Sequence, residues 1–456
     1  MNEAERKTTL VRNMTEGPIL RQMILFALPL MLGNLLQTVY SLADSVIVGQ
    51  FVGAAGLSAV ATGSEAVNLI TLVGMGFAAA GQVLIGQFVG KREPEKISRV
   101  AGTLFIVLFA IATVLMFVFI FFDDWVLRAM SMPQESMEYG RSYIVTCATG
   151  AFAIAGYNAV TAILRGIGDS KRPMLFIAIT SVLNVILDLV FVAAFRMGAF
   201  GAALATVLSQ YISFIISIIY LWRRRESIGF LVTREALRPS KRSFRLVMRL
   251  GIPQAVQMSA IMISLLFITS LINRYGVAAS AANGIGMKLE NITRVVCNAM
   301  GTAGCTMIAQ NFGARRFDRV RAVMRDMLIV MLISCLVIGL IIMFFPRQVF
   351  GFFTSDEGVL ALGEVYAVIG LFACIGHAAR TPFLQMSNGI GNALLSLIMG
   401  LMDGVVMRIG LSLLFSYVLG MELRGFWWGS CIAGYTPAII GAIYYFFGKW
   451  EKFELR

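Results

Sequence analysis

The sequence contains few charged residues and a single histidine. Asp, Glu, Lys and Arg make up 14% of its 456 residues, and hydrophobic types make up 58%. An average soluble domain has about 25% charged residues, so this composition argues against a single water-soluble core, a disordered chain and a disulfide-stapled secreted domain. It favours a polytopic membrane protein.

The cysteines form no Cys-x-x-Cys pair, which argues against both a zinc site and a redox pair. With one histidine (His377), no Ser–His pair and no nucleotide-binding loop, the sequence predicts neither a membrane enzyme nor a bound cofactor. The N-terminal residues are polar and charged, so no cleavable signal peptide is expected.

Long apolar runs dominate the sequence. The stretches 100–122 and 327–346 contain no charged residue, and each is long enough for a membrane helix, which needs about 20 residues. When one or two polar residues are admitted, the sequence predicts an all-α fold with twelve membrane spans. The predicted spans lie near residues 22–49, 56–88, 97–122, 138–164, 173–195, 198–222, 248–273, 277–308, 322–346, 361–388, 393–418 and 425–447.

The basic residues predict the orientation. If the N-terminus is cytoplasmic, the inside segments carry 28 of the 38 Lys and Arg residues and the outside loops carry six. Basic residues collect in cytoplasmic loops, so both termini are expected in the cytoplasm, with the protein in the plasma membrane. The net charge of +13 therefore does not indicate nucleic-acid binding. The longest polar run, 223–249, is expected to lie beside anionic lipid headgroups.

The two halves of the chain repeat each other. Ala27-Leu28-Pro29 aligns with Gly251-Ile252-Pro253 at an offset of 224, and Arg165-Gly166-Ile167-Gly168-Asp169 aligns with Asn388-Gly389-Ile390-Gly391-Asn392 at 223. Each half has six spans, so both enter the membrane in the same direction and form two lobes related by a pseudo-two-fold axis along the membrane normal. The predicted domains are an N-terminal lobe (1–222), a cytoplasmic linker (223–247) and a C-terminal lobe (248–456).

Pro29 and Pro253 fall inside the first span of each half. Each removes a backbone donor and bends its helix. Two interpretations stay open: a static kink, or a hinge that changes access to a cavity. Duplicated bundles with a site between or within their lobes are typical of secondary transporters.

The N-terminal half carries a polar cluster in otherwise apolar spans. Gln37, Tyr40 and Asp44 have the spacing i, i+3, i+7, and Asn184 and Asp188 have the spacing i, i+4, so each set shares one helix face. An ionisable residue at mid-bilayer costs about 2.5–3.5 kcal/mol, which points to a function. Further polar residues in this half are Asn158, Thr161, Thr206 and Ser209.

Two carboxylates with amide and hydroxyl oxygens suit a hard cation such as sodium. The same pair suits a proton, because two carboxylates close together in a low-dielectric cavity cannot both stay ionised. The sequence does not choose between these ions. Alternatively, Asp44 and Asp188 only satisfy helix–helix contacts; their C-terminal counterparts, near Ile268 and Leu411, are apolar.

The C-terminal half has intramembrane charges of its own. Glu290 and Arg294 are spaced i, i+4 and could pair, and Asp403 could pair with Arg380 or Arg408. The alternative is that these residues contact a substrate.

Three local motifs, together with the spans and the repeat, carry a family resemblance: Leu28-Pro29 with Tyr40-Ser41-Leu42-Ala43-Asp44-Ser45-Val46-Ile47-Val48-Gly49, Gly86-Gln87 with Gly90-Lys91, and Arg165-Gly166-Ile167-Gly168-Asp169-Ser170-Lys171-Arg172-Pro173. Over essentially its whole length, the chain resembles the MATE family, the multidrug and toxic compound extrusion transporters. The resemblance implies efflux of amphipathic, often cationic drugs, driven by inward flow of sodium ions or protons. It also implies that the coupling cation binds to Asp44, Asn184, Asp188 and Thr206.

Some members of that family carry an essential carboxylate in the seventh helix. Here Gln254, Gln257 and Ser259 follow the second proline, and no Asp or Glu lies between Gly251 and Asn273. The chain is therefore more similar to the branch that couples through the N-terminal lobe alone.

The resulting hypothesis is a monomeric exporter of small drug-like molecules that works by alternating access and has no cofactor besides its coupling ion. Its substrate cavity is expected to be lined by Gln37, Tyr40, Asn158, Met287 and Glu290. Its hinges are expected at Pro29 and Pro253. The alternative function is a flippase for lipid-linked sugars on a related fold. Such proteins usually need a basic cavity for pyrophosphate, whereas the N-terminal cluster here is acidic.

Overall fold

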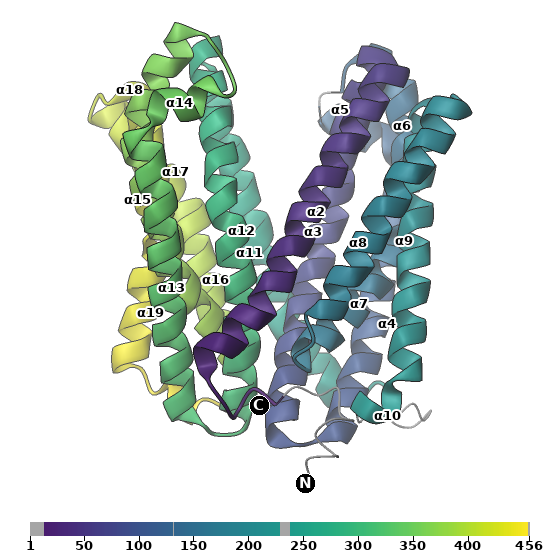
Figure 1. Ribbon diagram of the computed structural model, residues 1–456, viewed down its shortest axis with the longest axis vertical. Helices are drawn as coiled ribbons and strands as arrows, with labels where there is room; N and C mark the ends of the chain where they lie inside the picture. Colours follow the sequence, from purple (N-terminus) through teal and green to yellow (C-terminus); the bar gives the residue numbers. More distant parts are fainter. Residues whose placement is uncertain (1–12, 131, 229–237, 455–456) are drawn as a thin grey trace. The chain divides into compact units, whose positions relative to one another are not determined.

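The computed structural model describes residues 13–130, 132–228 and 238–454. Within these residues the chain is helical and has no β-strand, so the predicted all-α fold is confirmed (Figure 1). The chain forms two compact units. Of the described residues, unit 1 holds Leu28–Ala255, and unit 2 holds Met14–Ala27 and the residues from Val256 onward.

The long helices of unit 1 follow the chain in order. They are α2 (Ile19–Phe51, from Leu28 onward), α3 (Gly53–Lys91), α4 (Pro94–Phe121), α6 (Met137–Thr149), α7 (Ala151–Gly166), α8 (Lys171–Asp188), α9 (Gly198–Arg223) and the first part of α11 (Lys241–Asn273). Shorter elements are α5 (Asp123–Ala129), η1 (Gln134–Ser136), η2 (Leu189–Ala194) and α10 (Arg225–Ile228).

Unit 2 contains the rest of α11 and the helices that follow it. They are α12 (Val277–Gly313), α13 (Phe317–Phe344), α14 (Pro346–Gly351), α15 (Glu357–Ile390), α16 (Ala393–Leu401), α17 (Arg408–Leu413), α18 (Glu422–Ala433) and α19 (Thr436–Phe447). Shorter elements are η3 (Met402–Met407), η4 (Leu414–Val418) and η5 (Trp450–Lys452).

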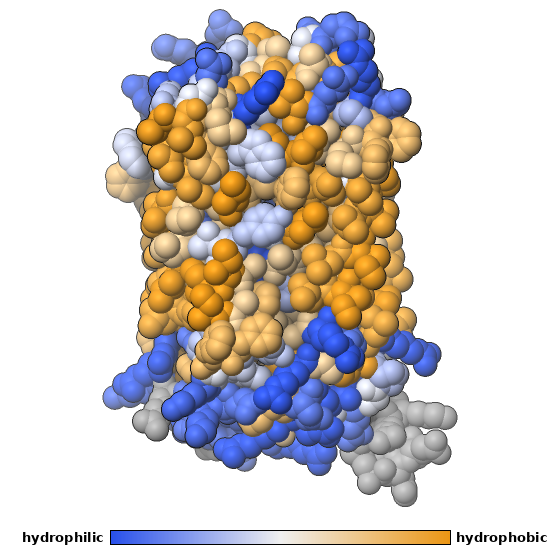
Figure 2. Space-filling model, turned by 90° about the vertical axis from the view of Figure 1, so that its left-hand side faces the viewer, coloured by the Kyte–Doolittle hydropathy of each residue, from blue (hydrophilic) through white to orange (hydrophobic). Residues whose placement is uncertain are grey.

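The helices coincide with the predicted spans. Ten helices among the described residues are long and apolar enough to cross a membrane, and the pair Gln134–Thr149 and Ala151–Gly166, bent by 45°, would make an eleventh. The predicted span 277–308 is also helical, as α12, although it is not among these ten. One face of the molecule shows a wide hydrophobic band with hydrophilic side chains above and below it (Figure 2), as expected for a multi-pass membrane protein.

The division between the units falls inside α2 and α11, close to their prolines. In α2 it lies after Ala27, two residues before Pro29, and in α11 it lies after Ala255, two residues after Pro253. The start of each helix therefore belongs to the unit formed mainly by the other half of the chain. The predicted lobe boundaries lack this exchange, and residues 229–237 of the predicted linker lie outside the described part of the chain.

Hydrogen bonds inside unit 2 hold the segment before α2. The buried Met14 donates its backbone N–H to Gln310 Oε1 at 3.0 Å, and its carbonyl oxygen accepts from Asn311 Nδ2 at 3.1 Å. Arg319 Nη2 donates to the carbonyl oxygens of Met14, at 3.3 Å, and Gly17, at 3.1 Å. These contacts explain why this segment belongs to unit 2.

The repeated motif at residues 165–169 and 388–392 precedes a helix in both units. Gly168 and Gly391 have φ angles of +96° and +85°, a left-handed conformation that favours glycine. The next residue in each unit caps the following helix: Oδ1 of Asp169 and Oδ1 of Asn392 accept from backbone N–H groups at 3.1 and 3.2 Å. The motif thus begins α8 in unit 1 and α16 in unit 2.

Gly166 lies where α7 approaches α3 closely. A Cβ atom there would lie 2.8 Å from Ile85 Cγ2 and 2.9 Å from the carbonyl oxygen of Gln82. We expect Gly166→Ala to lower the free energy of unfolding by about 1–3 kcal/mol, the usual cost of overpacking. Gly284 of α12 has open space around it, so the matched control Gly284→Ala should keep or raise stability. Melting temperatures in one detergent measure both effects, and equal losses would contradict the close approach.

Candidate cation and substrate site

Three helices of unit 1 bring the predicted cation-binding residues together. Helix α2 carries Asp44, α8 carries Asn184 and Asp188, and α9 carries Thr206. Asn184 Nδ2 donates a hydrogen bond to Thr206 Oγ1 at 3.4 Å. The carboxyl groups of Asp44 and Asp188 lie close enough to share a proton in a hydrogen bond. The side chains on α8 are almost fully buried, with 2% and 0% of their surface exposed.

This cluster has more acceptors than donors. Both carboxyl oxygens of Asp188, Oδ1 of Asp44 and Oδ1 of Asn184 are buried without a hydrogen-bond partner in the protein. Thr206 Oγ1 donates its own proton to the Ala202 carbonyl oxygen at 3.0 Å, so it offers only lone pairs to the cluster. Buried acceptors without donors are costly. A proton or a cation would satisfy these acceptors.

The oxygen set fits both ions that the sequence predicts. Carboxylate, amide and hydroxyl oxygens are the ligands that hard cations such as sodium prefer. Two facing carboxyl groups can instead hold one proton between them. In the part of the chain that the structure describes, no group of three or more His, Cys, Asp or Glu side chains could hold a metal ion, so a sodium ion would also use the neutral oxygens of Asn184 and Thr206.

The backbone around Asp188 departs from regular α-helix. Asp188 is the last residue of α8, and the π-helical turn η2 follows it directly. Such turns widen the helix and are frequent at functional sites. In unit 2 the π-helical turn η4 lies at the corresponding place, three residues after Leu411. The repeat therefore keeps the backbone feature but not the carboxylate.

Tyr40 and Gln37 extend the cluster along α2. The side chains of Gln37 and Tyr40 lie close to each other, and Tyr40 also lies close to both carboxylates. Tyr143 of α6, another neighbour of Asp44, is a residue that the sequence analysis missed. It is 5% exposed and packs in an apolar cluster. A tyrosine in an apolar span is usually a core residue, so the position of Tyr143 in the sequence does not indicate a polar neighbour.

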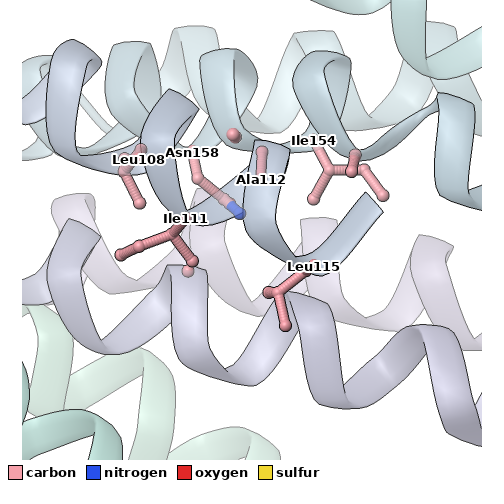
Figure 3. Close-up of a pocket in the computed structure, with 9 residues that line it drawn as sticks. Leu108, Ile111, Ala112, Leu115, Ile154 and Asn158 are labelled. Carbon is pink, nitrogen blue, oxygen red and sulfur yellow. The ribbon is translucent and has the colours of Figure 1, made fainter. Parts of the chain in front are cut away.

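Asn158 lies in a small pocket formed by α3, α4 and α7 (Figure 3). Its Nδ2 atom is buried and has no hydrogen-bond partner. None of the cation-cluster residues lines the pocket, so the role of Asn158 in a substrate cavity stays a prediction. The remaining lining residues are Gly74, Leu108, Ile111, Ala112, Leu115, Ala151, Ile154 and Ala155.

The other two predicted cavity residues belong to unit 2. Met287 Sδ accepts weak hydrogen bonds from Thr269 Oγ1 at 3.9 Å and Asn283 Nδ2 at 3.7 Å. Glu290 Oε1 accepts a short hydrogen bond from the hydroxyl of Tyr366 on α15. Their part in substrate binding stays a prediction.

Of the charge pairs predicted in unit 2, that of Asp403 is confirmed and that of Glu290 with Arg294 is not formed among the described residues. Glu290 Oε2 lies 3.7 Å from His377 Nε2, and Glu290 forms no ion pair with Arg294 among the described residues, although the spacing suggested one. Asp403 pairs with both of its candidate partners: Arg380 Nη1 and Arg408 Nη2 each lie 2.7 Å from one of its oxygens.

Replacing one carboxyl group by an amide should relieve the shortage of donors. We expect Asp188→Asn to raise the free energy of unfolding by about 1–3 kcal/mol in sodium-free buffer at pH 8, because the new amide can donate to Asp44. The control Asp124→Asn, on an exposed part of α5, should change stability little. Melting temperatures of the purified proteins measure both changes. A large fall for Asp188→Asn would mean that its carboxylate is satisfied in the folded protein.

Comparison with known proteins agrees with this architecture. The MatE family model matches residues 29–190 and again residues 253–414. The two matches begin at Pro29 and Pro253 and have the same length, so the predicted internal repeat is confirmed.

Relatives match over nearly the whole chain. The probable multidrug resistance protein YpnP of Bacillus subtilis is 30% identical over 449 residues, 97% of this chain and 98% of the relative. The probable multidrug resistance protein NorM of Thermotoga maritima is 23% identical over 95% of this chain and 94% of the relative. A solved structure of a multidrug resistance MATE family transporter in its outward-facing conformation shares the fold, with a TM-score of 0.87, 24% identity and coverage of 94% and 96%. The chain belongs to the MATE family of membrane transporters.

Proposed function

We propose that this protein exports amphipathic, often cationic compounds in exchange for sodium ions or protons. The observation that carries the proposal is the buried oxygen cluster of Asp44, Asn184, Asp188 and Thr206, whose acceptors outnumber its donors. The names of relatives such as YpnP and NorM, probable multidrug resistance proteins, support drug-like substrates.

Competition for one pair of carboxylates would couple the two fluxes. A cationic compound is attracted to Asp44 and Asp188, and the same carboxylates attract the sodium ion or proton that enters from outside. Binding of the ion supplies the positive charge and weakens the hold on the compound. Because each ligand lowers the affinity for the other, export and ion entry alternate.

Alternating access requires parts of the molecule that bend. Pro29 and Pro253 lack a backbone N–H inside long helices, and the boundary between the compact units lies two residues from each of them. We infer that these prolines act as hinges rather than as static kinks.

The remaining parts of the proposal concern setting and partners. The distribution of basic residues favours cytoplasmic termini and the plasma membrane. We propose that the protein works as a monomer, needs no cofactor besides its coupling ion, does not bind nucleic acid and transports its substrates without chemical change.

The cation cluster is tested by removing its charge. Asp44→Asn and Asp188→Asn should each lower coupled export at least tenfold while the protein still folds, because the antiported ion loses its counter-charge. The measurement is uptake of the organic cation rhodamine 123 into inside-out vesicles, with sodium and pH gradients varied independently. The gradient that drives uptake identifies the coupling ion.

Two outcomes would contradict this function. If both variants transport at wild-type rates under an imposed gradient, the carboxylates do not couple. If purified protein in liposomes moves no dye under either gradient but transfers lipid-linked sugars between leaflets, the protein is a flippase.

Replacing the hinge prolines restores a backbone hydrogen bond and stiffens the helices. Pro29→Ala and Pro253→Ala should slow transport several-fold and leave the dye affinity of the purified protein unchanged. Pro382→Ala, in the interior of α15 and away from the unit boundary, is the matched control and should keep the wild-type rate. Unchanged transport in all three variants would mean that the prolines are static kinks.

A further inference from the structure

The charged side chains inside unit 2 do not balance. Three guanidinium groups, of Arg294, Arg380 and Arg408, lie on α12, α15 and α17, and two carboxylates, of Glu290 and Asp403, accompany them. Asp403 is 1% exposed, and each of its oxygens receives one guanidinium at 2.7 Å. Two of the three arginines therefore share its single negative charge.

The second carboxylate is also engaged. Glu290 accepts from the Tyr366 hydroxyl and lies 3.7 Å from His377 Nε2. Its orientation toward α15 leaves Arg294, one turn further along α12, without an ion pair among the described residues. Within the described part of the chain, Arg294 forms one hydrogen bond, a long one of 3.5 Å from Nη2 to the carbonyl oxygen of Met287.

Glu290 lies near enough to attract Arg294 without a direct ion pair, but the three guanidinium groups still exceed the two carboxylates by one positive charge. Arg294 is partly buried near the middle of α12 and close enough to Arg380 for the two charges to repel. A guanidinium within the apolar part of a membrane protein is costly unless an anion or a water-filled cavity accompanies it. One uncompensated charge is balanced by one monoanionic group.

We propose that Arg294 binds the carboxylate of amphipathic substrates, with Arg380 adding to the attraction. The proposal rests on the proposed export function and names one substrate class within it. The planar guanidinium has several N–H donors that match a carboxylate in a two-point hydrogen bond. Met287, two turns away on α12, offers an adaptable apolar contact for the rest of the molecule.

A pair of dyes that differ only at the carboxyl group tests this. Rhodamine 110 has a free carboxylate, and rhodamine 123 is its methyl ester. Binding of each dye to purified protein in phosphatidylcholine nanodiscs is followed by fluorescence anisotropy. We expect Arg294→Ala to weaken rhodamine 110 binding about tenfold or more and to change rhodamine 123 binding less than about twofold, because only the acid loses a charge-assisted hydrogen bond.

Two further variants separate binding from folding. Arg294→Lys keeps the charge and should retain most of the affinity for the acid. Lys288→Ala removes another unpaired cation of α12, one that is exposed and lies over the Phe353 ring at 5.6 Å, and should not alter the preference for either dye. If Arg294→Ala does not fold, the Lys variant and Arg294→Gln carry the comparison.

The outcomes distinguish this inference from the function on which it rests. If no dye is transported by wild-type protein under either gradient, the export function fails. If the ester is exported normally and Arg294→Ala binds the acid as wild type does, only the carboxylate site is overturned. The site is also overturned if phosphatidylglycerol stabilises wild-type protein more than Arg294→Ala while the affinity for the acid is unchanged, since the anion is then a lipid phosphate.

Discussion

The interior of a bilayer offers no water, so every polar group placed there must find its partner in the protein or in what the protein binds. The two units respond to this constraint differently. In unit 1, oxygens of Asp44, Asn184 and Asp188 lie together without donors. In unit 2, Asp403 shares its one negative charge between two guanidinium groups, while Arg294 has no direct ion pair among the described residues. One unit lacks positive charge and the other has too much, and a transported ion or substrate can correct either imbalance.

Duplication supplied one scaffold, and the two copies then carried different side chains. Both keep a left-handed glycine and a capping side chain at the start of α8 and α16, and both keep a π-helical turn later in that span. Arg92 and Arg315 end the second helix of each half with the same φ of +57°. Both copies thus share these backbone features, whereas their charges differ: Asp188 has Leu411 as its counterpart.

The two prolines lie in the helices that the compact units share. Each lies in a helix whose start belongs to one compact unit and whose remainder belongs to the other. Hydrogen bonds from Gln310, Asn311 and Arg319 hold the segment before α2 inside unit 2. A helix shared in this way transmits any rearrangement of one unit to the other, and a missing backbone hydrogen bond is where it bends most easily.

The sequence by itself determined the spans, the repeat and the face that Asn184 and Asp188 share, because apolar length and helical spacing are local properties. The meeting of Asp44 with Asp188 across two helices was a hypothesis from their chemistry, to which the family resemblance added, and did not follow from spacing. Only the tertiary structure decided that Glu290 faces Tyr366 and His377 instead of Arg294, that Asp403 takes both arginines and that Tyr143 lies beside Asp44. Such pairings depend on the rotation and depth of neighbouring helices, which the spacing along a single helix does not contain.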